Sequence, residues 1–392
     1  MDGVGAPGTG PGVGPTAGAA SSAFFLSQRR GRWRWPWLIL SLVSALVVGM
    51  VALVAVAIGL LVAGEAGSAW AADAFETLDD GDVTATAPSQ VALLFFMVAA
   101  GFWPAALVAT LVHGRSPLSL VAPARAFRWS IVGKVLAFGV PSLLLVLLLP
   151  GLLDGSLTFT GFDVEHLVWT LPLLVIVLLQ TSAEDVFFKG YLLRQLGAVT
   201  RVVWLAPPIV ISVFVLLHVT NPDVQTNREL ALTYFVASEA LIIFLLLRTG
   251  GMEVPLTAHW VNNTMILLLV GERTTQANDL TLFVYDEQPL GLVGTLVAGA
   301  VLAAYLGAQL LAYTWPRSPF HLPHYEPPLP PRPGPASSPP PAPGAGAGLV
   351  YTPPRLDILP PPASAPVAGL SPPVVTHPTD ETTHPHDEVE GR

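Results

Sequence analysis

Long apolar segments that are almost free of charge restrict the fold of this chain more than any other feature. Of its 392 residues, 52% are hydrophobic and only 11% are charged, whereas a soluble domain carries about 25% charged residues. About 20 apolar residues in a helix are enough to cross the hydrocarbon core of a bilayer. Segments near or above this length lie at residues 37–63, 91–112, 130–150, 166–197, 203–220, 230–248, 254–271 and 289–314. We therefore predict an all-α, polytopic transmembrane helix bundle with about eight spans, and the lipid bilayer as its partner.

The two ends of the chain differ in composition from this middle part. Residues 1–28 are mainly Gly, Pro, Ala and Ser, which bury too little surface to fold, so we predict a disordered arm. Residues 316–392 are rich in proline and finish in an acidic, histidine-containing tip. That composition is typical of an extended cytoplasmic tail without a packed core. The membrane domain is then predicted at residues 29–315.

Arginines are distributed unevenly between the loops. Arg29, Arg30, Arg32 and Arg34 precede the first span, interleaved with tryptophans, as in an interfacial anchor. Further arginines lie in alternate loops, at Arg115, Arg125, Arg128, Arg194, Arg201 and Arg248. The positive-inside rule predicts a cytoplasmic-membrane protein with both termini in the cytoplasm. Because the basic stretch adjoins a span and the net charge is −9, no nucleic-acid partner is predicted.

Several ionisable or amide side chains interrupt the apolar segments. Such groups are costly in hydrocarbon and usually mark a functional site. The candidates are Glu184, Asp185, Lys189, His218, His259 and Asn263. The structural alternatives are a solvated helix end for the acids, an interfacial histidine at 218, and an interhelical hydrogen-bond pair for His259 and Asn263. Glu239 also lies in an apolar stretch; we expect it to pair with a site histidine or a packing partner and give it no catalytic role.

Glu184, His218, His259 and Asn263 form a set suited to peptide-bond hydrolysis. A carboxylate in a helix bundle can act as a general base on water, while imidazole and amide groups hold the water or the oxyanion. His259 and Asn263 are four residues apart and share a helix face. Glu184 and His218 each lie about 17 residues from a turn near residues 199–201, hence at similar depth. His259 should lie shallower, unless its helix tilts or an inner vestibule brings the groups together.

Three short motifs in this region resemble those of a known family. They read EDVFFKG at 184–190, FVLLH at 214–218 and HWVNN at 259–263. The CPBP intramembrane proteases, which include the type II CAAX prenyl endopeptidases and bacterial Abi-type proteins, carry paired glutamates with an arginine and glycine, then Phe with His four later, then His with Asn four later. The resemblance covers about residues 165–270. It implies that Glu184 activates water, with His218, His259 and Asn263 as the other catalytic residues.

Two positions depart from the family pattern. Asp185 stands in place of the second glutamate, and Lys189 in place of the arginine. Lysine offers a point charge where arginine offers a planar fork that holds two carboxylate oxygens. We therefore expect Asp185 and Lys189 to support the site through a looser pairing than in the family.

The resemblance implies an intramembrane endopeptidase whose partner is a peptide or protein substrate, membrane-associated ones included. The alternative is a non-catalytic membrane scaffold or bacteriocin-immunity-type protein of the same fold, which the departures at 185 and 189 favour. A proton-coupled transporter would also use buried His and Glu. No cofactor is certain: two histidines and a glutamate suit zinc, yet the His-Glu-x-x-His pattern of zinc proteases is absent. The chain has no cysteine, which excludes a thiolate nucleophile.

Overall fold

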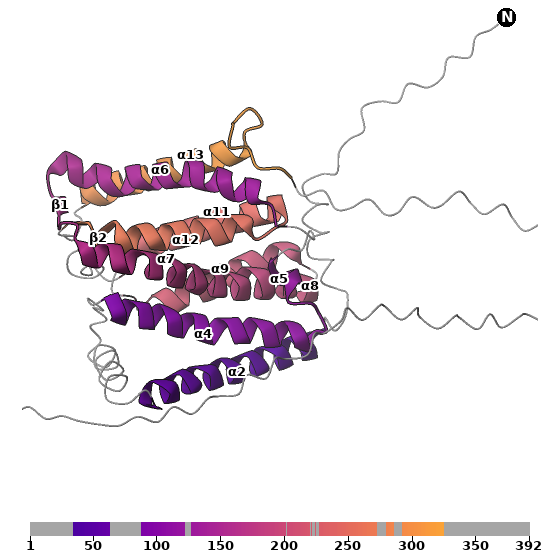
Figure 1. Cartoon of the computed structure of the whole chain (residues 1–392). Coiled ribbons are helices and arrows are strands. Elements are labelled where there is room, and N and C mark those ends of the chain that lie inside the picture. Colours follow the sequence, from indigo (N-terminus) through magenta and orange to yellow (C-terminus); the bar gives the residue numbers. More distant parts are fainter. Residues whose placement is uncertain are drawn as a thin grey trace, which may run out of the picture. The chain divides into compact units, whose positions relative to one another are not determined.

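The structure is a computed structural model that describes residues 34–62, 88–121, 127–200, 202–219, 221, 224, 227–272, 280–285 and 292–324. Within these residues, a helix occupies each of the eight predicted apolar segments (Figure 1). These helices are α2 (Trp35–Val62), α4 (Pro88–Val112), α6 (Trp129–Asp154), α7 (Val164–Asp185) with its continuation to Thr200, α9 (Ala206–His218), α11 (Arg228–Thr249), α12 (Glu253–Leu268) and α13 (Leu292–Thr314). The prediction of an all-α multispan bundle is confirmed. The predicted arm at residues 1–28 lies outside the described residues.

Six helical segments in the described part of the chain are long and apolar enough to cross a membrane. The other two predicted spans are shorter: α9 has 13 residues and α12 has 16. The segment from His166 to Thr200 has 35 residues, longer than a single crossing requires. The outer helices expose many large apolar side chains, such as Leu46 and Met50 on α2 and Leu296 on α13, as expected of surfaces that face lipid.

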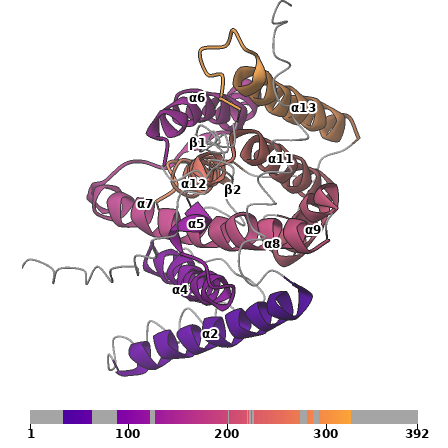
Figure 2. The ribbon, with the colours of Figure 1, turned by 90° about the vertical axis from the view of Figure 1, so that its right-hand side faces the viewer.

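Helix α12 lies at the centre of the bundle. It packs against α6, α7 and α11, and Figure 2 shows it nearly end-on among them. Helix α13 packs against α6 and α11, α4 against the other face of α7, and α2 against α4. Polar side chains on α12 therefore face neighbouring helices, and the site candidates on α7 and α11 can reach them.

Local sequence signals fix the ends of the helices beside α12. The Asp163 carboxylate accepts the backbone N–H of His166, and the His166 ring accepts the backbone N–H of Asp163, which forms a capping box at the start of α7. Helix α11 ends at Gly250, whose φ of 67° is left-handed and suits glycine. Only Gly251 and Met252 follow before α12 begins, so the two helices form a tight antiparallel pair.

The fourth segment continues beyond α7 as a π-helix, η2 (Val186–Leu193), and then as α8 (Arg194–Thr200). Almost all of η2 is buried, Lys189 and Gly190 included. A Cβ on Gly190 would lie 3.0 Å from the carbonyl oxygen of Leu120 in the short helix α5 (Leu118–Val121). The glycine thus allows η2 to pack directly on backbone. π-Helical turns are rare and are often found at functional sites.

A small three-stranded sheet, absent from the prediction, joins two of these helices at their far ends. Its strand order is β1-β3-β2, from β1 (Thr158–Phe159), β3 (Phe283–Tyr285) and β2 (Val270–Glu272). β3 pairs antiparallel with β1, with Thr158 opposite Val284, and parallel with β2, with Val270 opposite Phe283. Because β1 precedes α7 and β2 follows α12, the sheet fixes the start of α7 beside the end of α12.

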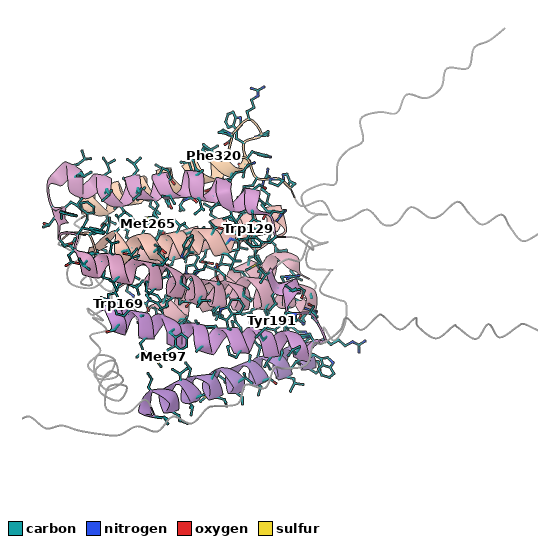
Figure 3. All side chains as sticks on the ribbon, in the orientation of Figure 1. Met97, Trp129, Trp169, Tyr191, Met265 and Phe320 are labelled. Carbon is teal, nitrogen blue, oxygen red and sulfur yellow. The ribbon has the colours of Figure 1, made fainter. Side chains whose placement is uncertain are left out.

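The packed part of the bundle extends past the predicted limit at residue 315. Leu322 is fully buried beside Tyr313 and Val135, and its backbone N–H donates to the Tyr313 carbonyl at 2.9 Å. Nζ of Lys134 donates to the His321 carbonyl at 2.6 Å. Residues 315–324 thus form a terminal strap on α6 and α13; Phe320, at the top of Figure 3, belongs to it. The predicted disorder of the tail beyond residue 324 lies outside the described residues.

Candidate active site

Glu184 stands at the last turn of α7 and is buried, with 7% of its surface exposed. Its Oε2 atom has no hydrogen-bond partner. Across from it, Nε2 of His259 on α12 lies 3.8 Å away. The solvated helix end, the structural alternative for the acidic pair, is therefore wrong, since Asp185 is also fully buried.

His259 contacts both acids of the pair through its two ring nitrogens. Its Nδ1 lies 3.3 Å from Oδ1 of Asp185, while Nε2 faces Glu184. An ionised carboxylate only accepts hydrogen bonds, so Asp185 fixes the ring with a proton on Nδ1. This leaves Nε2 available on the side of Glu184.

Lys189 binds two carboxylates inside the bundle. Its Nζ donates to Oδ1 of Asp185, one turn earlier, and to Oε1 of Glu239 on α11 at 3.0 Å. The ammonium also lies 5.0 Å from the centre of the Phe214 ring, a favourable cation–π position. Glu239 thus pairs with Lys189, which packs against it from η2, and not with a site histidine.

His218 ends α9 and is oriented by its own helix. Its Nδ1 is 2.7 Å from the carbonyl oxygen of Phe214, and its ring stacks on the Phe214 ring at a centroid distance of 4.3 Å. Phe214 in turn meets His259 edge-on at 6.1 Å. His218 interacts electrostatically with Glu184, without a direct hydrogen bond between the two in the described structure. It therefore lies on the border of the cluster, while His259 lies within it.

Asn263 follows one turn after His259 and faces α7 at Gln180. Its Nδ2 donates to Oε1 of Gln180 at 3.4 Å, and its Oδ1 accepts from Nδ2 of Asn262 at 3.2 Å. Gln180 also interacts with Glu184, one turn later on α7. The Tyr234 hydroxyl donates to Oδ1 of Asn262 at 2.6 Å. This network connects the carboxamide of Asn263 with the carboxylate of Glu184.

The antiparallel packing of α7 and α12 explains how the candidates meet. His259 faces Asp185 and Asn263 faces Gln180, so one turn forward on α12 corresponds to one turn back on α7. Glu184 lies 20 residues after Val164, about 30 Å along the helix at 1.5 Å per residue. It is thus near the same end of the bundle as the start of α12. His259 reaches both acids although it lies near the start of α12, because the fourth segment continues past its acids into buried helix.

Three residues of this cluster were not predicted from the sequence: Gln180, Asn262 and Tyr234. Gln180 had a usable signal, because it precedes Glu184 by four residues and so shares its helix face. Tyr234 lies on α11, outside all three motifs. Only the packing of α11 on α12 reveals its position.

A zinc site does not fit these side chains. Among the described residues, no group of three or more His, Asp and Glu side chains is arranged to hold a metal ion. Glu184 and His259 approach each other, but Asp185 is occupied by Lys189, and His218 lies at the border of this cluster, where it stacks on Phe214.

Fold and site together define a multispan membrane protein in which carboxylates, imidazoles and carboxamides meet inside the helix bundle. Residues 166–265 match the family described as type II CAAX prenyl endopeptidase Rce1-like. The resemblance seen in the three motifs is confirmed, and the family is one of membrane proteases.

A curated relative is similar to a larger part of the chain. The protein "Uncharacterized protein YyaK" of Bacillus subtilis (strain 168) is 25% identical over 189 residues, which cover 47% of this chain and 61% of that protein. The chain thus spans less than two thirds of the relative's length. No solved structure matches the chain.

Proposed function

We propose that this protein is an intramembrane endopeptidase of the CAAX-protease type, with Glu184 as the general base. The observation that supports this is the buried Oε2 of Glu184, unpartnered and 3.8 Å from Nε2 of His259. This separation is too long for a direct hydrogen bond and suits a bridging water. Water held there lies against a carboxylate that can take its proton.

In the proposed reaction, Glu184 removes a proton from water and the water oxygen attacks the carbonyl carbon of the peptide bond. As the tetrahedral intermediate collapses, the C–N bond breaks and Glu184 returns the proton to the leaving amine. Each histidine has its Nδ1 occupied, so Nε2 holds the water or, when the ring is protonated, donates to the oxyanion. Asn263 donates one amide hydrogen to Gln180, and the second is available to the oxyanion.

The test is replacement of Glu184 by Gln in the purified full chain, reconstituted in lipid vesicles. A fluorescence-quenched peptide with a C-terminal Cys-aliphatic-aliphatic-X sequence, prenylated and unprenylated, is the first probe. We expect E184Q to lose at least about 10²-fold in kcat, the lower range for general acid–base catalysis. The matched control is E229Q, because Glu229 is exposed on α11. E184Q turnover equal to that of E229Q overturns the assignment of the base.

The non-catalytic alternative was motivated by Asp185 and Lys189. Both residues have charged partners in the bundle, His259 and Glu239 included, so the pair is not left loose by the departures. Restoring the family residues as D185E/K189R distinguishes the two functions. A hampered protease should gain activity, whereas the phenotype of a scaffold should stay the same.

We also propose that the protein lies in the cytoplasmic membrane with both termini in the cytoplasm, from its arginine distribution. The chain has no cysteine, so single cysteines can be introduced without removing others. S156C, between α6 and α7, should react with a membrane-impermeant maleimide in intact cells. R317C, after α13, should react only after lysis; the reverse labelling pattern contradicts this orientation.

A further inference from the structure

Glu239 is a buried carboxylate that the proposed reaction does not use. It lies on α11, outside the three family motifs, and only 6% of its side chain is exposed. Both of its carboxylate oxygens lie about 3.0 Å from Nζ of Lys189. A carboxylate in the interior requires such a partner. The pairing also leaves only Lys189 between Glu239 and the site residue Asp185.

Lys189 connects Glu239 with the acid that orients His259. Oδ1 of Asp185 accepts from both Lys189 and Nδ1 of His259, while Oδ2 of Asp185 has no hydrogen-bond partner. Two donors therefore compete for one oxygen. How strongly each donor binds this oxygen depends on whether the Lys189 ammonium has another acceptor for its N–H groups.

Glu239 supplies this other acceptor. An ammonium has three N–H donors and no acceptor, and Lys189 is fully buried. If Glu239 became neutral, Asp185 would be the one ionised partner that Lys189 keeps among the residues the structure describes. The attraction between unlike charges is strong in an interior of low dielectric, so the lysine would draw the Asp185 oxygen away from His259.

We propose that Glu239 is a positioning residue of this site: it holds Lys189 between two carboxylates, so that Asp185 keeps the His259 ring turned towards Glu184. The catalytic consequence rests on the proposed function. Partners of this kind, one step removed from a working histidine, fix its tautomer and orientation. The arrangement also accounts for a lysine at position 189. Its ammonium donates separately to Asp185 and to Glu239, whereas the planar fork of an arginine would direct two donors to one carboxylate.

The experiment reads the His259 ring directly and needs no substrate. The full chain is labelled with ¹⁵N-histidine and reconstituted in lipid vesicles, and the His259 signals are identified by their loss in H259Q. We expect one fixed tautomer, protonated at Nδ1, in the parent and in the control E229Q, which removes an exposed glutamate from the same helix. In E239Q the two ring signals should move towards tautomer averaging, and in E239D they should stay close to those of the parent.

A suppressor variant keeps the proposal testable if E239Q folds poorly. K189M/E239Q removes the ammonium and its extra acceptor together, so neither of these two charges is left without the other, and Asp185 keeps His259 as its partner. The ring signals of this double variant should return to those of the parent. Parent-like signals in E239Q, or equal disturbance in E239Q and K189M/E239Q, overturn the proposal.

Turnover of the Cys-aliphatic-aliphatic-X peptide gives the second readout. We expect E239Q to lower kcat by about tenfold, the lower range for outer partners of histidine ligands, with KM changed less than twofold. A rise in KM with unchanged kcat would contradict a positioning role. If the parent cleaves no peptide, the proposed function fails, while the ring signals still decide the role of Glu239.

Discussion

Arg128 and Glu253 form a two-pronged ion pair at the base of the central helix. Nε and Nη2 of Arg128 donate to Oε1 and Oε2 of Glu253 at 2.8 and 2.9 Å, and the Arg128 backbone N–H donates to Oε1 at 3.0 Å. Glu253 is the first residue of α12 and Arg128 directly precedes α6. The pair therefore fixes α12, which carries His259, against the start of α6.

Breaking this pair should destabilise the bundle. R128A leaves a carboxylate that is only 2% exposed without its charged partner, which costs about 3–5 kcal/mol. R128K should cost less but not be neutral, because lysine cannot donate in parallel to both oxygens. Thermal unfolding in detergent measures both. Equal losses of stability in R128A and in the double variant R128A/E253A would mean that the loss in R128A does not come from leaving Glu253 unpaired.

The carboxamide network should affect turnover more than stability. N263A removes the proposed oxyanion donor, and we expect a loss of about 10²–10³ in kcat. N262A removes the amide that holds Oδ1 of Asn263 and the acceptor of the Tyr234 hydroxyl, but no proposed oxyanion donor, so its loss in kcat should be smaller. The control is T264V, because the hydroxyl of neighbouring Thr264 is buried without a hydrogen-bond partner. Steady-state kinetics with equal kcat for N263A and T264V would exclude Asn263 from the reaction.

Gly190 should tolerate no side chain. In G190A the new Cβ meets the Leu120 carbonyl oxygen at 3.0 Å, and overpacking of this kind costs about 1–3 kcal/mol. Gly299 on α13 gives a matched control, since nothing lies within 4 Å of its Cβ position. G299A should be neutral or stabilising, because Ala is the better helix former by roughly 0.5–1 kcal/mol. Equal shifts in the melting temperatures of G190A and G299A would contradict the close packing of η2 on α5.

The terminal strap should contribute to the stability of the bundle. L322A removes a fully buried leucine and should cost about 2–5 kcal/mol. L311A is the matched control, because Leu311 on α13 is 56% exposed and its loss should stay within about 0.5 kcal/mol. Denaturant unfolding in detergent compares them. Equal midpoints would mean that residues 315–324 do not pack on the bundle in solution.

The sequence by itself determined the helices and most members of the site. Hydrophobic length is a local property, so each apolar segment predicts its own helix without reference to the others. The spacing of His259 and Asn263 likewise places both on one helix face before any packing is known. The motif at 184–190 identified Glu184 with its neighbours, again from adjacent residues.

Only the tertiary structure decided how these side chains are paired. Glu239 and Tyr234 lie on α11 outside the motifs, and this helix is largely apolar, so periodicity does not indicate which face meets which neighbour. Lys189 could be assigned its second partner, Glu239, only once α11 was seen to lie beside η2. The physical reason is that buried charges are satisfied across helices: helix formation depends on neighbours in sequence, whereas the pairing of charges depends on which distant surfaces the packing brings together.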